Sequence, residues 1–266
     1  MRITCSFVII SLCHFNFVTS KKCFKSICMP SGYDKLINPP TKNATTEILI
    51  RFREIQILNI DENESRITLK LAIVMLWFEP RLFISANATE EDKKHTIEPP
   101  IFLPKEFVNL LWLPDAYIPD IHKINKYKFL REFEAFYYNS GNQIASKIEV
   151  EIVLFCKMNF EAFPMDENTC YFSVGSHAPL KLSAQLFNLN SAPIGFDASE
   201  QVAKLDFTIN VKEALPKDVD KTLDGYYYQR SGFEIKFQRK VTGYITSYYI
   251  PSGILVVLSW VSNFYK

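Results

Sequence analysis

Cysteine is the residue type in this sequence whose chemistry is easiest to assign. Residues 1–20 begin with a positive charge, continue through an apolar run and end in small residues, which predicts a secretory signal peptide. Its apolar core is shorter than the roughly 20 residues of helix that a membrane crossing needs. The remaining cysteines, Cys23, Cys28, Cys156 and Cys170, would then lie outside the cell, where disulfides persist. Three pairings are open, and we favour Cys23 with Cys28 and Cys156 with Cys170 because these bridges close the shortest loops.

No pattern of catalytic residues accompanies these cysteines. The sequence has no glycine-rich phosphate loop, no Gly-x-Ser-x-Gly and no His-Glu-x-x-His, and three histidines remain after the signal. We therefore expect no enzyme, no catalytic residue, no cofactor and no tight metal site. A net charge of +1 with 22% charged residues gives no basic surface, so nucleic acid is not an expected partner.

Three N-glycosylation motifs fit the same extracellular setting. They begin at Asn43, Asn63 and Asn87. Together with the signal peptide and the paired cysteines, they predict a secreted glycoprotein surface.

The elements that must position these residues are mostly strands. Apolar residues come in short runs or alternate with polar ones, as in 48–52, 67–71 and 148–152, and turn-forming residues separate them. This pattern predicts one all-β sandwich of about ten strands over residues 21–242. We also expect a short N-terminal helix near Ser31–Leu36 and a helical turn within Pro104–Leu111.

The C-terminal segment has a different pattern. Residues 244–265 run for 22 positions without a charge and carry aromatic residues at both ends. This length and these aromatic belts predict a transmembrane helix over 243–266. Pro251 would be tolerated in a membrane bundle, where neighbours satisfy the freed carbonyl. A buried strand pair or a lone anchor is the alternative.

Four ordered motifs resemble those of one family. The disulfide-sized loop from Cys156 to Cys170 encloses 13 residues, including Phe-Pro-Met-Asp at 163–166. The other three motifs are Trp77-Phe-Glu-Pro-Arg-Leu, Trp112-Leu-Pro-Asp, and Tyr249-Ile-Pro-Ser with Ser259-Trp-Val-Ser. Over about residues 31–266 the chain therefore resembles subunits of the Cys-loop pentameric ligand-gated ion channels, in particular the chloride-conducting glycine-, GABA- and glutamate-gated branch of invertebrates. Trp77 and Trp112 are expected to anchor the sandwich core.

The resemblance implies an extracellular immunoglobulin-like β-sandwich followed by the first transmembrane helix of a channel. It further implies a plasma-membrane location, including postsynaptic membranes, assembly with other subunits into a homo- or heteropentamer, and a small-molecule agonist bound between subunits. Residues expected to couple binding to gating are Asp61, Glu62, Glu64, Asp166 and Arg239, which would form a charge cluster beside the membrane, and Pro164 of the disulfide loop.

The agonist site that the resemblance implies is aromatic. The residues that fall at its positions are Tyr117, His177, Tyr226, Tyr227 and Tyr228. Aromatic faces there would attract an ammonium group. The sequence departs from amino-acid-gated relatives because Ala72 and Val74 stand in place of an aromatic residue and an arginine, which weakens the case for carboxylate recognition. No cysteine follows Cys170, so the capping loop lacks a second disulfide.

Two alternatives remain open. His177, His122 and Asp120 suggest a proton- or zinc-gated chloride channel, because histidine titrates near neutral pH and binds zinc. The sequence also stops at Lys266, before a pore-lining helix, which suggests a gene fragment, a splice form, or a membrane-tethered ligand-binding or regulatory subunit without its own pore.

Overall fold

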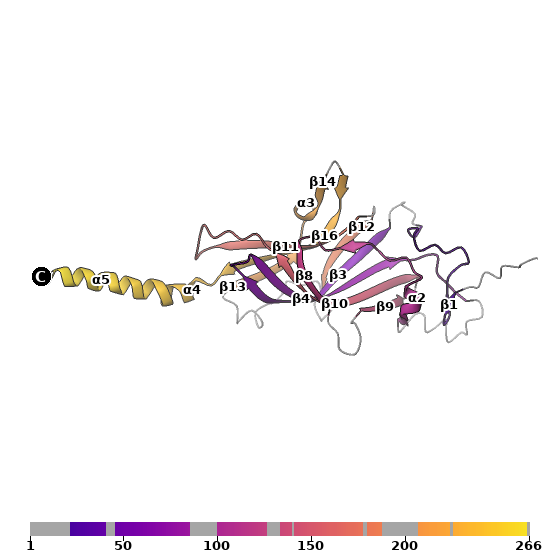
Figure 1. Ribbon diagram of the computed structural model, residues 1–266, viewed down its shortest axis with the longest axis horizontal. Coiled ribbons are helices and arrows are strands. Elements are labelled where there is room, and N and C mark those ends of the chain that lie inside the picture. The colour runs from indigo at the N-terminus through magenta and orange to yellow at the C-terminus, as the bar shows by residue number, and fades with distance from the viewer. Residues whose placement is uncertain are drawn as a thin grey trace, which may run out of the picture.

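The computed structural model describes residues 22–40, 46–85, 100–126, 134–139, 141–177, 180–187, 207–223 and 226–264, with only the backbone described for Phe187 and for positions 221–223 and 226–228. Its body is a sandwich of β-sheets, and a long helix extends from one end (Figure 1). The predicted all-β architecture with one C-terminal membrane-type helix is thus confirmed.

The larger sheet has seven strands. The order is β12 (Lys181–Phe187), β3 (Glu47–Asp61), β4 (Arg66–Phe78), β10 (Gln143–Phe155), β9 (Glu134–Asn139) and β6 (Ile101–Leu103), with β8 (Ile121–Lys126) also paired to β10. β12 runs parallel to β3, and the other pairs are antiparallel.

The facing sheet has four strands, in the order β13 (Phe207–Glu213), β16 (Arg230–Arg239), β11 (Glu167–Ser176) and β7 (Ala116–Tyr117). Two smaller sheets join β1 (Cys23–Phe24), β2 (Ile27–Cys28) and β5 (Phe83–Ile84), and β14 (Lys221–Leu223) with β15 (Tyr226–Tyr228). Nine strands of the described chain have six or more residues, in line with the ten predicted, and the others are shorter.

The core lies between the two large sheets because alternate residues of each strand point inward. Ile48, Ile50 and Phe52 of β3 are at most 1% exposed. The Phe52 ring meets Phe172 of β11 and Phe233 of β16 at centroid distances of 5.4 and 5.1 Å, both edge to face. These aromatic contacts join the two sheets at the centre of the sandwich.

The end of the sandwich that is distant from the long helix is closed by the predicted tryptophans. Trp77 and Trp112 are 2% and 5% exposed, and their rings meet edge to face at 6.4 Å. Trp112 follows the short helix α2 (Lys105–Val108), so the helical turn predicted there is confirmed. Both tryptophans therefore act as core anchors.

The helix predicted over Ser31–Leu36 is wrong. This segment forms turns, in which the Tyr33 N–H donates to the Pro30 carbonyl at 3.1 Å. The Asp34 carboxylate accepts the Leu36 N–H at 2.8 Å, a local bond that competes with helical hydrogen bonding. Tyr33 is instead held by tertiary contacts: its hydroxyl donates to Glu79 at 3.0 Å and accepts the Trp112 N–H at 2.8 Å.

The C-terminal helix continues directly from β16. It comprises α4 (Val241–Tyr244), a π-helical turn η2 (Ile245–Tyr249) and α5 (Ile250–Phe264), which leaves the sandwich as a rod (Figure 1). Among the described residues, Val241–Phe264 is the one helical segment long and apolar enough to cross a membrane.

Proline explains the π-helical turn. Pro251 has no N–H for the carbonyl four residues earlier, and its ring crowds that carbonyl. The wider turn just before it relieves the crowding. The Ser252 hydroxyl donates to the carbonyls of Tyr248 and Tyr249, one turn earlier in the helix, at 2.7 and 3.1 Å.

Candidate functional site: a buried arginine and an aromatic half-site

Arg239 lies at the junction between the sandwich and the helix. It is the last residue of β16, and α4 begins two residues later. Its side chain is 0% exposed, so its guanidinium must be fully paired to be tolerated there. Two carboxylates and one hydroxyl provide the acceptors.

Asp166 accepts one bidentate pair of hydrogen bonds. Its Oδ1 lies 2.8 Å from Arg239 Nε, and its Oδ2 lies 3.1 Å from Nη2. Glu62 accepts the second pair, with Oε1 at 2.7 Å from Nη1 and Oε2 at 3.0 Å from Nη2. This fork geometry is the strong form of an arginine–carboxylate contact.

Aromatic rings surround the same guanidinium. Its carbon lies 4.8, 4.9 and 5.3 Å from the ring centroids of Phe163, Phe207 and Tyr244. Nη1 also donates to the Tyr244 hydroxyl at 3.0 Å. Tyr244 belongs to α4, so Arg239 contacts the first turn of the helix directly as well as both carboxylates.

Pairing changes the acid–base behaviour of this cluster. Hydrogen bonds from Arg239 lower the pKa of Asp166, against the opposing effect of its burial. Burial alone would lower the pKa of Arg239, but the bonds to Asp166 and Glu62 more than offset it and raise that pKa. Asp166 and Arg239 are therefore both charged at neutral pH.

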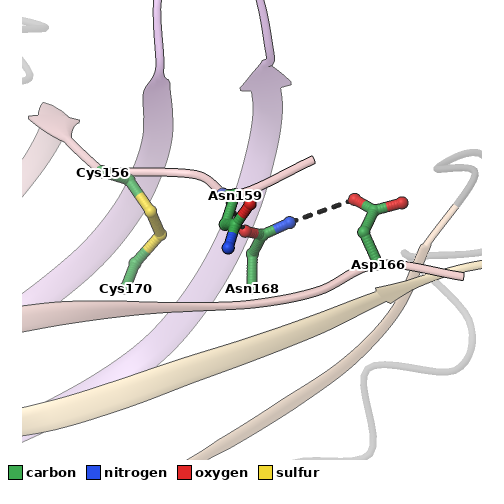
Figure 2. The surroundings of a disulfide bond; sticks show 5 residues. All are labelled: Cys156, Asn159, Asp166, Asn168 and Cys170. Carbon is green, nitrogen blue, oxygen red and sulfur yellow. Dashed lines mark hydrogen bonds between the residues drawn. A yellow bond between two sulfur atoms is a disulfide. The ribbon is translucent and has the colours of Figure 1, made fainter. Parts of the chain in front are cut away.

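The loop that carries Asp166 is closed by the predicted disulfide. Cys156 follows β10 and Cys170 lies in β11, so the bridge links the two sheets. Figure 2 shows Asn168 inside this loop, donating to Asp166 Oδ2 at 3.1 Å. The same amide accepts the Asn159 N–H at 2.6 Å. The second predicted bridge, Cys23–Cys28, joins β1 to β2.

Of the residues expected in the charge cluster, the structure brings Glu62, Asp166 and Arg239 together. Asp61 Oδ1 instead accepts the N–H groups of Asn63 and Glu64 and so closes the turn between β3 and β4. The Glu64 carboxylate pairs with Arg66.

Pro164, the remaining residue of the predicted coupling set, follows a cis peptide bond and is buried within the disulfide loop. It stands one residue after Phe163, whose ring packs edge to face on Tyr244 at 5.3 Å. The disulfide loop therefore contacts α4 through Phe163.

The predicted aromatic site is partly assembled within one chain. Tyr117 of β7 and His177, just after β11, stack with centroids 4.3 Å apart and planes 10° apart. Strand pairing explains the meeting, since Tyr117 pairs with Gly175. A side chain at Gly175 would stand only 2.9–3.0 Å from the Tyr117 ring, so glycine permits this close approach.

Asp115 fixes the backbone of this half-site. Its carboxylate accepts the Ser176 hydroxyl at 2.5 Å and the His177 N–H at 2.9 Å. Asp115, just before β7, thereby binds the end of β11, the neighbouring strand of the sheet.

Arg230 is a member of the site that sequence reasoning missed. It begins β16, with its guanidinium carbon 5.9 Å from the Tyr117 ring centroid and Nη2 3.4 Å from the Tyr117 hydroxyl. Its own N–H donates to Asp220 at 2.7 Å. The sequence also did not predict the contacts of Tyr244 and Asn168 with the Arg239 cluster. The spacing of Arg230, Tyr244 and Asn168 in the sequence does not distinguish them from polar residues on the surface.

The remaining predicted residues are placed less fully. Tyr226, Tyr227 and Tyr228 form β15 and pair with β14 in a hairpin that projects from the sandwich (Figure 1), but their side chains lie outside the description. Asn63 is exposed in the turn after β3. Asn43 and Asn87 lie outside the described residues.

Ala72 and Val74 both lie on β4. The histidine alternative gains no metal site, because the described residues contain no group of three or more His, Cys, Asp or Glu side chains that could hold a metal ion. His122 packs instead against Phe155, with centroids 5.1 Å apart. Asp120 takes a positive φ of 57° in the turn before β8.

Comparison with known proteins fits this architecture. Residues 21–241 match the family model described as neurotransmitter-gated ion-channel ligand binding domain. The chain is 23% identical over 244 residues to pH-sensitive chloride channel 2 of Drosophila melanogaster, a match covering 88% of this chain and 45% of that protein.

Two receptor subunits are similarly related. Gamma-aminobutyric acid receptor subunit pi of Bos taurus is 24% identical, covering 88% of this chain and 50% of the relative. Gamma-aminobutyric acid receptor subunit beta of Lymnaea stagnalis is 25% identical, covering 87% and 46%. The chain thus spans about half the length of the curated relatives it matches.

Proposed function

Because the chain belongs to the family of neurotransmitter-gated ion-channel ligand-binding domains, we propose that it is a subunit of a ligand-gated channel in the plasma membrane. A small-molecule agonist would bind to the sandwich, at contacts with neighbouring subunits of a pentamer, and this binding would open a chloride-selective pore. Like other members of this family, it is not an enzyme.

The observation that carries this proposal is the Arg239 cluster. One guanidinium bonds to the turn after β3 through Glu62, to the disulfide loop through Asp166 and to α4 through Tyr244. A movement of either loop therefore changes contacts with the residue at the head of the membrane helix. A ligand that binds one arrangement of these loops more tightly would shift the helix with them.

Chloride selectivity is supported by relatives, one named as a chloride channel and others as gamma-aminobutyric acid receptor subunits. The property would be tested on currents from the full native coding sequence. We expect the reversal potential to follow the chloride gradient when external chloride is replaced, and a reversal potential that follows sodium instead would refute chloride selectivity.

Coupling can be tested in a chimera. Residues 21–266 of this chain would replace the matched region of the Drosophila pH-sensitive chloride channel, and surface-expressed receptors would be screened with amines, amino acids and proton steps. We expect at least one such stimulus to evoke current. Arg239→Gln should reduce the maximal current while agonist binding remains.

The matched control is Lys236→Gln, which removes a cation from the same strand where it is 42% exposed and pairs weakly with Glu167 at 3.5 Å. This control should leave the current unchanged. If Arg239→Gln receptors reach the surface and give the same dose–response curve as the parent, the coupling role is refuted.

Protons are a second candidate agonist, favoured by His177 in the half-site and by the pH-sensitive channel among the relatives. The charged and titratable groups described around His177 are Tyr117, Asp115 and Arg230. Protonating the imidazole would add a cation to the Tyr117 ring face. A chimera gated by protons should lose that response in His177→Phe; if it responds to acid equally with phenylalanine there, His177 is not the sensor.

A further inference from the structure

Asn168 of the disulfide loop is buried beside Asp166. It is 4% exposed, so both ends of its amide need a hydrogen-bond partner. Its Oδ1 accepts the Asn159 N–H at 2.6 Å, and its Nδ2 donates to Asp166 Oδ2 at 3.1 Å (Figure 2). One amide therefore joins the first half of the loop, at Asn159, to the carboxylate in the second half.

The two partners determine which way this amide points. An asparagine side chain has an oxygen that accepts and a nitrogen that donates. The Asn159 N–H can only donate. The Asp166 carboxylate can only accept, because Arg239 holds the pKa of Asp166 below its usual value and keeps it ionised at neutral pH. A rotated amide would place donor against donor and acceptor against acceptor, and each buried group left unpaired is costly.

Asn168 and Arg239 bind the same carboxylate. Asp166 Oδ2 accepts the Asn168 Nδ2 and the Arg239 Nη2, both at 3.1 Å, and Oδ1 accepts the Arg239 Nε at 2.8 Å. A two-bond contact requires the carboxylate to lie close to the guanidinium plane, but the last torsion of an aspartate is soft. Because Asn168 holds one of the two oxygens, it limits rotation of the carboxylate away from that plane.

The first half of the loop is also bonded to the turn between β3 and β4. The Cys156 N–H donates to the carbonyl of Ser65, which lies between Glu62 and β4, at 2.9 Å. A displacement of this turn would therefore act on the loop at Cys156, shortly before the N–H that Asn168 accepts. The amide of Asn168 would carry the displacement to Asp166.

We propose that Asn168 is a positioning residue, whose amide aligns the Asp166 carboxylate with Arg239 and makes this alignment depend on the first half of the loop. For its effect on gating, the inference rests on the proposed function. The alignment itself can be measured in the purified chain, whether or not the chain is part of a channel.

The first test follows the thermal unfolding of the purified chain in detergent as a function of pH. Asn168→Asp keeps an acceptor for the Asn159 N–H but places a second carboxylate against Asp166, and two adjoining carboxylates raise the pKa of the pair. The raised pKa belongs to the folded chain, so stability increases as the pH falls toward the unfolded value of about 3.9. We expect the variant to unfold at a lower temperature than the wild type at neutral pH and to approach it at about pH 5.

The surroundings of the pair are the same in the variant and the wild type. Arg239, Glu62 and Tyr244 are the other charged or titratable groups recorded in this cluster, and their titration cancels to first order in the comparison. The matched control is Asn59→Asp, which adds the same charge at an exposed position of β3 and should follow the wild-type pH profile.

Asn168→Leu is the second variant and decides the matter if Asn168→Asp does not fold. Leucine removes both bonds of the amide and adds no charge. If Asn168 supports Asp166, the folded pKa of Asp166 rises toward the unfolded value, and the stability deficit relative to the wild type shrinks below about pH 4. If Asn168 only ties the loop together, the deficit is the same at every pH, and this result would overturn the proposal.

Gating in the chimera supplies the second measurement. Asn168→Leu should raise the half-maximal agonist concentration about tenfold at unchanged surface expression. In an Arg239→Gln background the same substitution should have no further effect, because the contact that Asn168 aligns is absent. Identical dose–response curves with and without Asn168→Leu would overturn the proposal. A pH-dependent deficit in a chain whose unmodified chimera gives no current would instead uphold the positioning role and count against the channel function.

Discussion

Removal of the Arg239 guanidinium is the most informative single change in this molecule. In Arg239→Gln, the Asp166 carboxylate, whose side chain is 1% exposed, keeps only neutral donors such as Asn168. Glu62 is 34% exposed and can be solvated by water. Breaking a buried ion pair by removing one partner costs about 3–5 kcal/mol, and the solvated Glu62 favours the lower value, about 3 kcal/mol.

A loss of about 3 kcal/mol corresponds to a fall in unfolding temperature of about 6–12 °C for a domain of this size. Thermal unfolding of the chain in detergent measures it. Lys236→Gln is the control and should change stability by at most about 0.5 kcal/mol, because its partner lies 3.5 Å away on an exposed surface. Asp166→Asn combined with Arg239→Gln should cost less than the sum of the single changes, since the double variant leaves no buried unpaired charge.

The pH dependence supplies a second signature. The pKa of Asp166 is lowered in the folded chain, chiefly by Arg239. This contribution to stability is therefore complete above the unfolded value of about 3.9 and is lost as the pH falls through the lower folded pKa. The difference between wild type and Arg239→Gln should be largest near neutral pH and shrink below about pH 4. A difference no larger than that of Lys236→Gln, or one that persists unchanged in acid, would refute the reasoning.

Other changes have equally definite expectations. Gly232→Ala would place a methyl group 1.9 Å from the Phe172 carbonyl oxygen. We therefore expect the folded protein to be lost on size-exclusion chromatography, and we expect no expression or assay temperature to restore it fully. Tyr33→Phe removes the acceptor of the Trp112 N–H and the donor to a buried carboxylate, and should lower the free energy of unfolding, measured by chemical denaturation, by about 1–3 kcal/mol. Burial also raises the pKa of Tyr33 to about 12, so wild-type stability should not depend on this phenol between pH 7 and 9. Cys156→Ser opens a 15-residue loop worth about 3 kcal/mol and should abolish surface assembly, which normal surface labelling of the variant would contradict.

Much of the fold could be predicted because it depends on local patterns. Alternation of apolar residues fixes which face of β3 is buried, and an uncharged run fixes the membrane-type helix. Loop length alone favoured the bridges of Cys23 and Cys156 with their nearest partners. The helix expected over Ser31–Leu36 was wrong because the hydroxyl of Tyr33 and the carboxylate of Asp34 form other bonds there.

The candidate site depends on distances that no local pattern encodes. Asp61, Glu62 and Glu64 lie within four positions of one another, yet only Glu62 reaches Arg239; Asp61 closes its own turn and Glu64 pairs with Arg66. The geometry of the turn between β3 and β4 determines which of the three carboxylates contacts Arg239. Residue types and spacing identified three candidate acids but could not show which one makes the contact.

What the sequence by itself determined is the set of elements, the two disulfides and the family to which the chain belongs, because these follow from periodicity, loop closure and ordered motifs. What only the tertiary structure decided is the chemistry at each end of β16. There, side chains 60 or more positions apart meet because strands pair: His177 covers Tyr117, Arg230 stands beside that ring, and Asp166 reaches Arg239. Strand register brings these groups within bonding distance, and register is set by the whole sheet.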